Sequence, residues 1–197
     1  NDGDSENDAD LTGESITWND VEPGEYKIKL NIQNSQDMVD SDTIKVYVSY
    51  AAKWSDFEMG GNTSGNGVEL DFDVTISYDR DTGNTIRKAV AELTYPQQDG
   101  DCTNIPGTNN CRAKLDIYAY NEDDDEAANT SNIGLDQRNN GDDCDEENND
   151  CVFLTMSSYI FGDGDTTYGD GDWTFKIKND KQNDLQVESF IIRLVYV

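Results

Sequence analysis

The sequence has no histidine and few basic residues, and these absences exclude several classes of protein. Without histidine the chain has no Ser-His-Asp or Cys-His catalysis and no histidine-ligated zinc. It holds 14 Lys and Arg against 42 Asp and Glu, a net charge of −28. A chain this acidic repels nucleic-acid backbones and anionic membrane surfaces. No apolar run approaches the roughly 18 residues of a membrane span, so we expect no membrane insertion.

The chain also lacks an initiator Met and a signal peptide, and it opens at Asn1. We interpret it as a mature form or an excised piece of something longer. Hydrophobic residues make up 35% of the 197, below the usual ~45–50%. They are nevertheless gathered into alternating runs, and we find no helical period of ten or more residues. The pattern therefore predicts a folded, all-β protein with short strands and long polar loops.

The clearest motif near the start lies in residues 12–49. Pro23-Gly24 predicts a turn, and two alternating strands follow, with apolar positions at Tyr26, Ile28, Leu30, Ile32, Ile44, Val46, Val48 and Tyr50. The segment TWNDVEPGEYKIKLNIQNSQDMVDSDTIKVYVS resembles the second half of a PKD (polycystic-kidney-disease) domain. The first strands of that family are missing here. An open sheet edge is therefore expected, to be completed by other copies of this chain or by the rest of a longer parent chain.

A second β region follows the junction at residues 49–54, which contains no flexible linker. Alternation is uninterrupted from Val68 to Tyr78 and returns at 89–95, 113–119 and 173–177. Residues 151–156 predict another short strand, and 190–197 is apolar on both faces except at Arg193, as a central sandwich strand would be. The strings KLDIYAYNEDDDEAANTS, GDWTFKI and ESFIIRLVYV resemble the jelly-roll β-sandwich of proprotein-convertase P-domains and bacterial pre-peptidase C-terminal (PPC) domains. We therefore expect two packed β-sandwich domains: a partial Ig-like/PKD-like one in residues 1–50 and a jelly-roll-like one in 51–197. Trp54 or Phe57 should pack near their interface.

Four cysteines flank two polar loops, without the CxxC spacing of a zinc site. Their positions predict two disulfides, Cys102–Cys111 and Cys144–Cys151, although crossed pairings between the loops remain open. Disulfides in polar loops are typical of proteins outside the reducing cytosol. We therefore expect a secreted or cell-surface protein.

Asp outnumbers Glu by 30 to 12, and Asp favours turns and the chelation of hard cations. The predicted calcium ligands lie in the loop GDGDTTYGDGD, in the acidic run at 123–126 and in the N-terminal segment: Asp163, Asp165, Asp170, Asp172, Asp123, Asp125, Asp2 and Asp4. The alternative for each group is an ordinary solvated turn. High-salt adaptation is the alternative account of the acidity as a whole.

Other candidate sites are sparse. Asn62 and Asn129 begin glycosylation sequons in predicted loops. Exposed aromatics that could bind glycans are Tyr118, Tyr120, Tyr159 and Tyr168. We find no Gly-x-Ser-x-Gly, phosphate loop or dinucleotide fingerprint, and a carboxylate pair carries no information among 42 acids.

The sequence thus predicts a protein that is not an enzyme. Its expected role is that of a calcium-stabilised extracellular module, structural or adhesive, in a surface filament, polymer or large surface protein. An accessory domain pair of a secreted hydrolase or protease is the first alternative, because both resembled families often occur there. A carbohydrate-binding module is the second.

Overall fold

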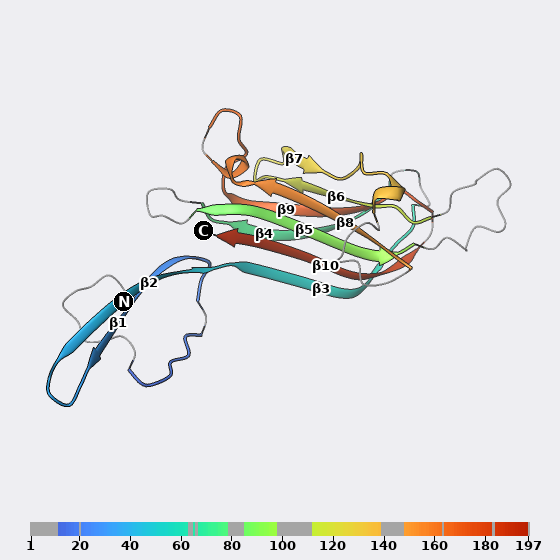
Figure 1. Cartoon of the computed structure of the whole chain (residues 1–197). Helices are drawn as coiled ribbons and strands as arrows, with labels where there is room; N and C mark the ends of the chain where they lie inside the picture. The colour runs from blue at the N-terminus through green and yellow to red at the C-terminus, as the bar shows by residue number, and fades with distance from the viewer. Residues whose placement is uncertain are drawn as a thin grey trace.

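The computed structural model describes residues 12–19, 21–62, 65, 67–78, 85–97, 112–138, 148–162, 164–182 and 184–196. These ranges are almost entirely β (Figure 1). The elements are β1 Gly24–Gln33, β2 Val39–Val48, β3 Tyr50–Met59, β4 Val68–Ile76, β5 Ile86–Pro96, β6 Leu115–Tyr120, β7 Glu126–Asn129, η1 Leu135–Gln137, β8 Asn149–Ser157, η2 Ser158–Phe161, β9 Gly171–Asn179 and β10 Leu185–Tyr196. No helix in these ranges is long and apolar enough to span a membrane.

Eight of the strands form a sandwich of two antiparallel sheets. One sheet has the order β3-β10-β5-β8 and the other β4-β9-β6-β7. Because side chains alternate across a strand, each sheet turns one apolar row inward. Trp173, Phe175 and Ile177 of β9 are fully buried, as are Phe190 and Ile192 of β10. The sequence prediction of an all-β, sandwich-like fold is confirmed.

The periodic strands lie where alternation predicts them, and β10 is a central strand between β3 and β5 as expected. Strand β3 departs from simple alternation. Asp56 adopts a left-handed conformation (φ 55°), and both Ser55 and Asp56 face outward. Trp54 and Phe57 can therefore both face the other sheet although three positions separate them, and the partner strand β10 breaks its alternation at the same place, with Val187 and Phe190 both buried.

An aromatic cluster formed by Trp54, Phe57, Phe72 and Phe190 joins the two sheets. Phe72 comes from β4, and its ring lies 4.9 Å from that of Trp54 and 4.8 Å from that of Phe190. Trp54 also stacks on Phe190 at 5.9 Å. Trp54 therefore packs inside the sandwich, between its own β3 and the facing sheet.

Strands β1 and β2 form a separate two-stranded sheet. They pair antiparallel over their whole length, from Gly24 opposite Val48 to Gln33 opposite Val39. Ser49 alone separates β2 from β3, and the hairpin extends away from the sandwich (Figure 1). The described part of the first fifty residues thus contains a hairpin rather than a second sandwich.

Candidate functional site

The β1–β2 hairpin carries an apolar face that its own sandwich does not cover. Cross-strand partners share a face, so the register places Ile28 beside Ile44 and Tyr26 beside Val46. We call this the apolar hairpin face; its members are Tyr26, Ile28, Leu30, Ile32, Ile44, Val46 and Val48. Leu30 is 60% exposed and Ile44 56%. Trp18 extends the face, since its ring lies edge-on to Tyr26 at 5.0 Å.

The opposite face of the hairpin is basic. Lys27 lies directly opposite Lys45, and Lys29 is the next outward residue on β1. Like charges directly opposite each other are destabilising. Glu25 offsets part of this repulsion through an ion pair with Lys45 at 2.7 Å. That hydrogen bond lowers the pKa of Glu25 from its usual value. The hairpin is therefore amphipathic, with one apolar and one lysine-bearing face.

Two of the four predicted glycan-binding tyrosines come together. Tyr118 and Tyr120 project from the same side of β6, with ring centroids 6.5 Å apart and planes inclined by 17°. Lys176 and Lys178 of β9 lie over these rings at 5.4 and 6.0 Å. Partial burial raises the pKa of both phenols. Because the lysines already cover part of the rings, we interpret the row primarily as a set of cation–π contacts between β9 and β6.

The other two tyrosines lie apart from this row. Tyr168 packs against the buried Trp173 at 6.4 Å, and Tyr159 is 66% exposed in η2. The four tyrosines therefore do not form one platform.

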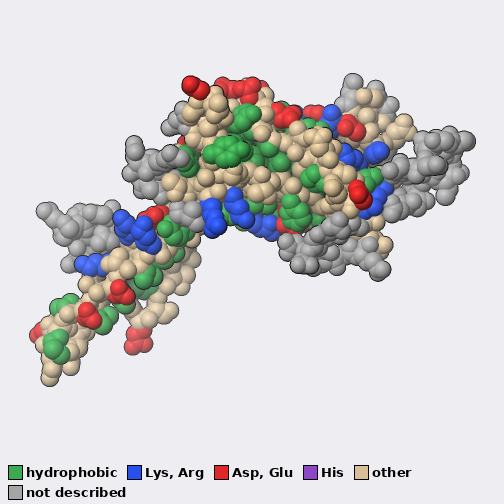
Figure 2. All heavy atoms as spheres, turned by 45° about the horizontal axis from the view of Figure 1, so that its top comes forward, with side chains coloured by type: hydrophobic (Ala, Val, Ile, Leu, Met, Phe, Trp, Pro, Cys, Tyr) green, Lys and Arg blue, Asp and Glu red, His purple; other side chains and the backbone are tan. Residues whose placement is uncertain are grey.

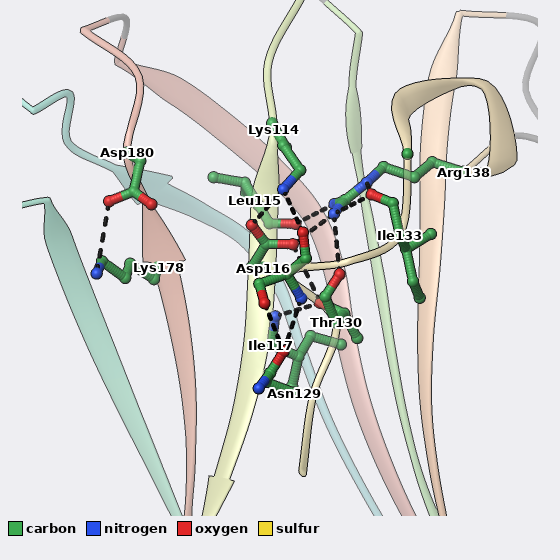
Figure 3. Close-up of polar contacts among 12 residues, drawn as sticks. Lys114, Leu115, Asp116, Ile117, Asn129, Thr130, Ile133, Arg138, Lys178 and Asp180 are labelled. Carbon is green, nitrogen blue, oxygen red and sulfur yellow. Dashed lines mark hydrogen bonds and ion pairs between the residues drawn. The ribbon is translucent and has the colours of Figure 1, made fainter. Parts of the chain in front are cut away.

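A buried polar cluster surrounds Arg138 (Figure 3). Its side chain is fully buried, and its guanidinium donates to the Asp116 carboxylate, to Tyr95 Oη at 3.0 Å and to the Leu115 carbonyl. It also donates to the carbonyls of Thr130 and Ile133. Every nitrogen of the guanidinium therefore has a protein acceptor, and no donor is left for a ligand.

The rest of the Arg138 cluster is also internally satisfied. Lys114 Nζ donates to Asp116 Oδ2 at 3.0 Å and to the Ser131 carbonyl at 2.9 Å. The Cys151 amide donates to the Arg138 carbonyl at 2.5 Å, which ties the segment to β8. Through these hydrogen bonds and ion pairs, the Arg138 cluster holds residues 130–138 against the sandwich. Sequence analysis did not identify it, although Arg138 is the only cation in the acidic stretch 121–150.

Of the predicted calcium ligands, Asp2, Asp4 and Asp163 lie outside the described residues. Asp123 and Asp125 lie in the β6–β7 turn, and Asp165 in the turn before β9. Asp170 accepts from the Tyr78 amide at 3.4 Å. Asp172, predicted in a loop, is instead in β9, where it accepts from Thr75 Oγ1 at 2.7 Å. Within the described ranges no three His, Cys, Asp or Glu residues group to hold a metal.

Two of the acidic turns nevertheless lie at the same end of the sandwich. Asn121 Nδ2 donates to the Tyr168 carbonyl at 3.1 Å, which joins the β6–β7 turn to the turn before β9. Gly171 has φ +105°, and a Cβ placed there would lie 2.7 Å from Glu122 Oε2. The positive φ favours glycine at this position, and Glu122 lies beside it. The fold thus concentrates negative charge that is dispersed along the sequence.

The two sequons have different surroundings. Asn62 lies in coil after β3, as predicted, and its Oδ1 accepts from the Gly65 amide at 2.6 Å. The loop prediction for Asn129 is wrong, because Asn129 ends β7. Its Nδ2 donates to Glu126 at 2.5 Å, and the next residue, Thr130, is buried.

Of the four cysteines, Cys151 lies in β8 and is not a free thiol. Cys102, Cys111 and Cys144 lie outside the described residues, so the pairing stays a prediction. We expect alkylation of the unreduced folded protein to add no mass, because both short loops are closed. Each closure contributes about 2–3 kcal/mol in the chain-entropy model. Intact mass spectrometry before and after alkylation checks this, and a labelled cysteine would refute it.

No family model matches the chain, and no curated protein matches it. Among solved structures it is similar to the VP2 subviral particle of infectious bursal disease virus, with a TM-score of 0.37 and 10% identity. That match covers 84% of this chain, which spans 36% of the length of VP2. A carbohydrate-binding module of the β-sandwich superfamily is similar over 89% of this chain and 75% of its own, with a TM-score of 0.28 and 13% identity. Likeness at this level carries no argument about function.

Proposed function

We propose that this chain is a non-enzymatic structural or adhesive module of an extracellular assembly, and that it attaches through the apolar hairpin face. The observation that carries the proposal is the location of exposed apolar side chains. Ten large hydrophobic residues are exposed in the described ranges, and nine of them lie between residues 16 and 47. Exposed patches of this kind mark interaction surfaces.

The polar groups of the sandwich support the same proposal because they are engaged internally. The Arg138 cluster leaves no donor for a ligand, and Asp170 and Asp172 accept hydrogen bonds from β4 and the segment after it. An open depression where β3 ends and β10 begins is lined by Glu58, Asp184 and Gln186, and no Lys or Arg is among its lining residues. Asp184 accepts from the Gly61 amide at 2.6 Å.

Cross-linking of native material tests the proposal. The lysine face of the hairpin supplies reactive amines at Lys27, Lys29 and Lys45. We expect a lysine-directed reagent, applied to the source material and followed by mass spectrometry, to join these residues to another polypeptide. A native chain that sediments as a free monomer, with hairpin lysines linked only within the chain, would overturn the proposal.

Carbohydrate binding is a second candidate, favoured by the paired rings of Tyr118 and Tyr120. Aromatic faces on an outer sheet surface can stack on sugars. Glycan-array binding that is lost in Tyr118→Ala/Tyr120→Ala and kept in Tyr159→Ala would support this candidate. Equal glycan binding by the unmodified protein, the Tyr118→Ala/Tyr120→Ala variant and Tyr159→Ala would exclude the Tyr118–Tyr120 row as the site.

Calcium stabilisation is part of the proposal. A site at the turn before β9 depends on Asp163, since the described residues there form no three-ligand group. A ligand that binds only the folded state at a hundred times its Kd adds about 2.7 kcal/mol. We therefore expect millimolar Ca²⁺ to raise the melting temperature by roughly 5–10 °C more than Na⁺ at equal ionic strength. Differential scanning calorimetry measures both.

A variant pair locates the calcium effect. Asp163→Asn/Asp165→Asn should lose the calcium-specific increment. Asp40→Asn/Asp42→Asn changes the charge equally on the hairpin and should keep it. Equal stabilisation of the unmodified protein by Na⁺ and Ca²⁺ would leave high-salt adaptation as the account of the acidity.

A further inference from the structure

The hairpin is too small to be stable through its own contacts. A two-stranded sheet is marginal in water, and three or more strands or a packed face are needed for independent stability. Here the two strands are ten residues each and form a sheet of their own. Leu30, Ile32 and Ile44 are more than half exposed. A further surface that covers these side chains would therefore stabilise the hairpin.

Charge decides where another copy of this chain could approach. Residues 24–48 hold four acids and three lysines, a net charge of −1. Residues 49–197 carry −19, and residues 1–23 carry −8. Two copies repel each other strongly through their sandwiches, and least through their hairpins. The hairpin also projects beyond the sandwich, so a contact there keeps the two acidic bodies apart (Figures 1 and 2).

The distribution of apolar side chains selects the same contact. On a second copy, the described sandwich surface offers Tyr159 as its one exposed large hydrophobic residue. Four of the other nine, Ile28, Leu30, Ile32 and Ile44, belong to the apolar hairpin face, whereas Val39 and Tyr47 lie on the opposite, lysine-bearing face. An apolar hairpin face finds its best counterpart, within the described residues, in the apolar hairpin face of another copy.

We propose that this chain forms a two-fold symmetric dimer in which the apolar hairpin faces of two copies pack against each other. The inference rests on the proposed attachment function and names its partner as a second copy. Ile28 and Ile44, directly opposite each other, lie at the centre of the contact. Asp40 and Asp42 lie on the same face, directly opposite Ile32 and Leu30, towards the hairpin tip. The lysine faces remain in solvent.

The size of the face predicts a reversible dimer. Ten-residue strands span about 34 Å, and two of them are roughly 10 Å wide with their side chains. The area of the apolar hairpin face, about 34 Å by 10 Å, is therefore below the ~800 Å² per partner of a standard interface. We therefore expect dissociation on dilution. Because two chains of charge −28 repel each other, raising the salt concentration should strengthen the dimer.

Sedimentation velocity of the whole chain, over a concentration series at low and high salt, tests the proposal. The expected result is a monomer–dimer equilibrium that shifts towards dimer at high salt. A monomer at every concentration and salt would overturn it. Continued growth into larger species would also overturn it, because that requires a head-to-tail contact rather than a closed, symmetric one.

Variants locate the contact. Ile28→Thr/Ile44→Thr keeps β-branched side chains but removes apolar surface, and it should weaken the dimer roughly tenfold or more. Tyr159→Thr changes the exposed large hydrophobic residue of the sandwich and should leave the dimer unchanged. Unchanged melting of the sandwich in both variants excludes misfolding. A dimer that is indifferent to the hairpin variant would overturn the proposed contact.

Hydrogen exchange separates this inference from the function on which it rests. Amides of β1 and β2 should become more protected as the concentration of the purified chain rises. Suppose that the purified chain stays monomeric but native cross-links join Lys27 or Lys45 to a different polypeptide. The dimer is then refuted, and the attachment function stands. Failure of both experiments refutes both.

Discussion

Arg138→Met should lower the free energy of unfolding by about 3–5 kcal/mol, the cost of removing one partner of a buried ion pair. Arg138 is fully buried and Asp116 is 4% exposed. Without the guanidinium, the Asp116 carboxylate keeps Lys114 and Thr130 but loses its fully buried charged partner. The carbonyls of Leu115 and Ile133 also lose donors. Urea denaturation followed by circular dichroism measures the loss.

A second arginine in the same chain provides the matched control. Arg193 donates to Glu92 at 2.6 Å, but its side chain is 43% exposed. Because Glu92 itself is buried, Arg193→Met should cost more than the roughly 0–1 kcal/mol of an exposed ion pair but less than Arg138→Met, whose guanidinium is fully buried. Asp116→Asn combined with Arg138→Met should recover part of the loss, because the buried carboxylate that loses its guanidinium partner is also removed. Equal losses in the free energy of unfolding for Arg138→Met and Arg193→Met would contradict the proposed structural role of the Arg138 cluster.

The Arg138 cluster shows where sequence reasoning stops. A single cation among twelve acids in residues 121–150 was visible in the sequence. Its partners were not, because Tyr95 lies 43 positions away and Leu115 lies 23. Such contacts are set by the packing of β5 against β6 across the sandwich, and no local pattern encodes them.

Periodicity served well where one strand face is buried and the other solvated. The alternation of Val68 to Ile76 and of Trp173 to Ile177 predicts β4 and β9, which pair with each other. It did not predict β3, where the left-handed Asp56 shifts the inward positions. It did not predict β7 either, because Glu126–Asn129 is too short for a period.

The proposed interaction surface was predictable in part. Alternation identified Tyr26 to Ile32 and Ile44 to Val48 as strands with one apolar face, and the shortage of partner strands indicated an open sheet. The sequence could not show that the hairpin extends away from the sandwich (Figure 1). That depends on β2 running almost directly into β3, an edge strand of the sheet β3-β10-β5-β8.

Phe190→Ala should be the most damaging single change in the apolar core of the sandwich that we consider. Phe190 is fully buried on the central strand β10 and contacts Trp54 and Phe72. Truncating a buried phenylalanine typically costs about 3–5 kcal/mol, from lost transfer energy and the cavity left behind. For a chain of this length, that lowers the melting temperature by roughly 10 °C or more.

The aromatic cluster also supplies graded controls for Phe190→Ala. Phe57 contacts Phe72 at 5.7 Å but is only partly buried, so Phe57→Ala should cost less. Tyr159 is 66% exposed, and Tyr159→Ala should change stability by no more than about 0.5 kcal/mol. Thermal denaturation should therefore rank the losses Phe190, Phe57, Tyr159. A loss at Phe57 that equals or exceeds the loss at Phe190 would contradict the placement of Phe190 at the centre of the cluster. In that case β3, rather than β10, would carry most of the contact between the sheets.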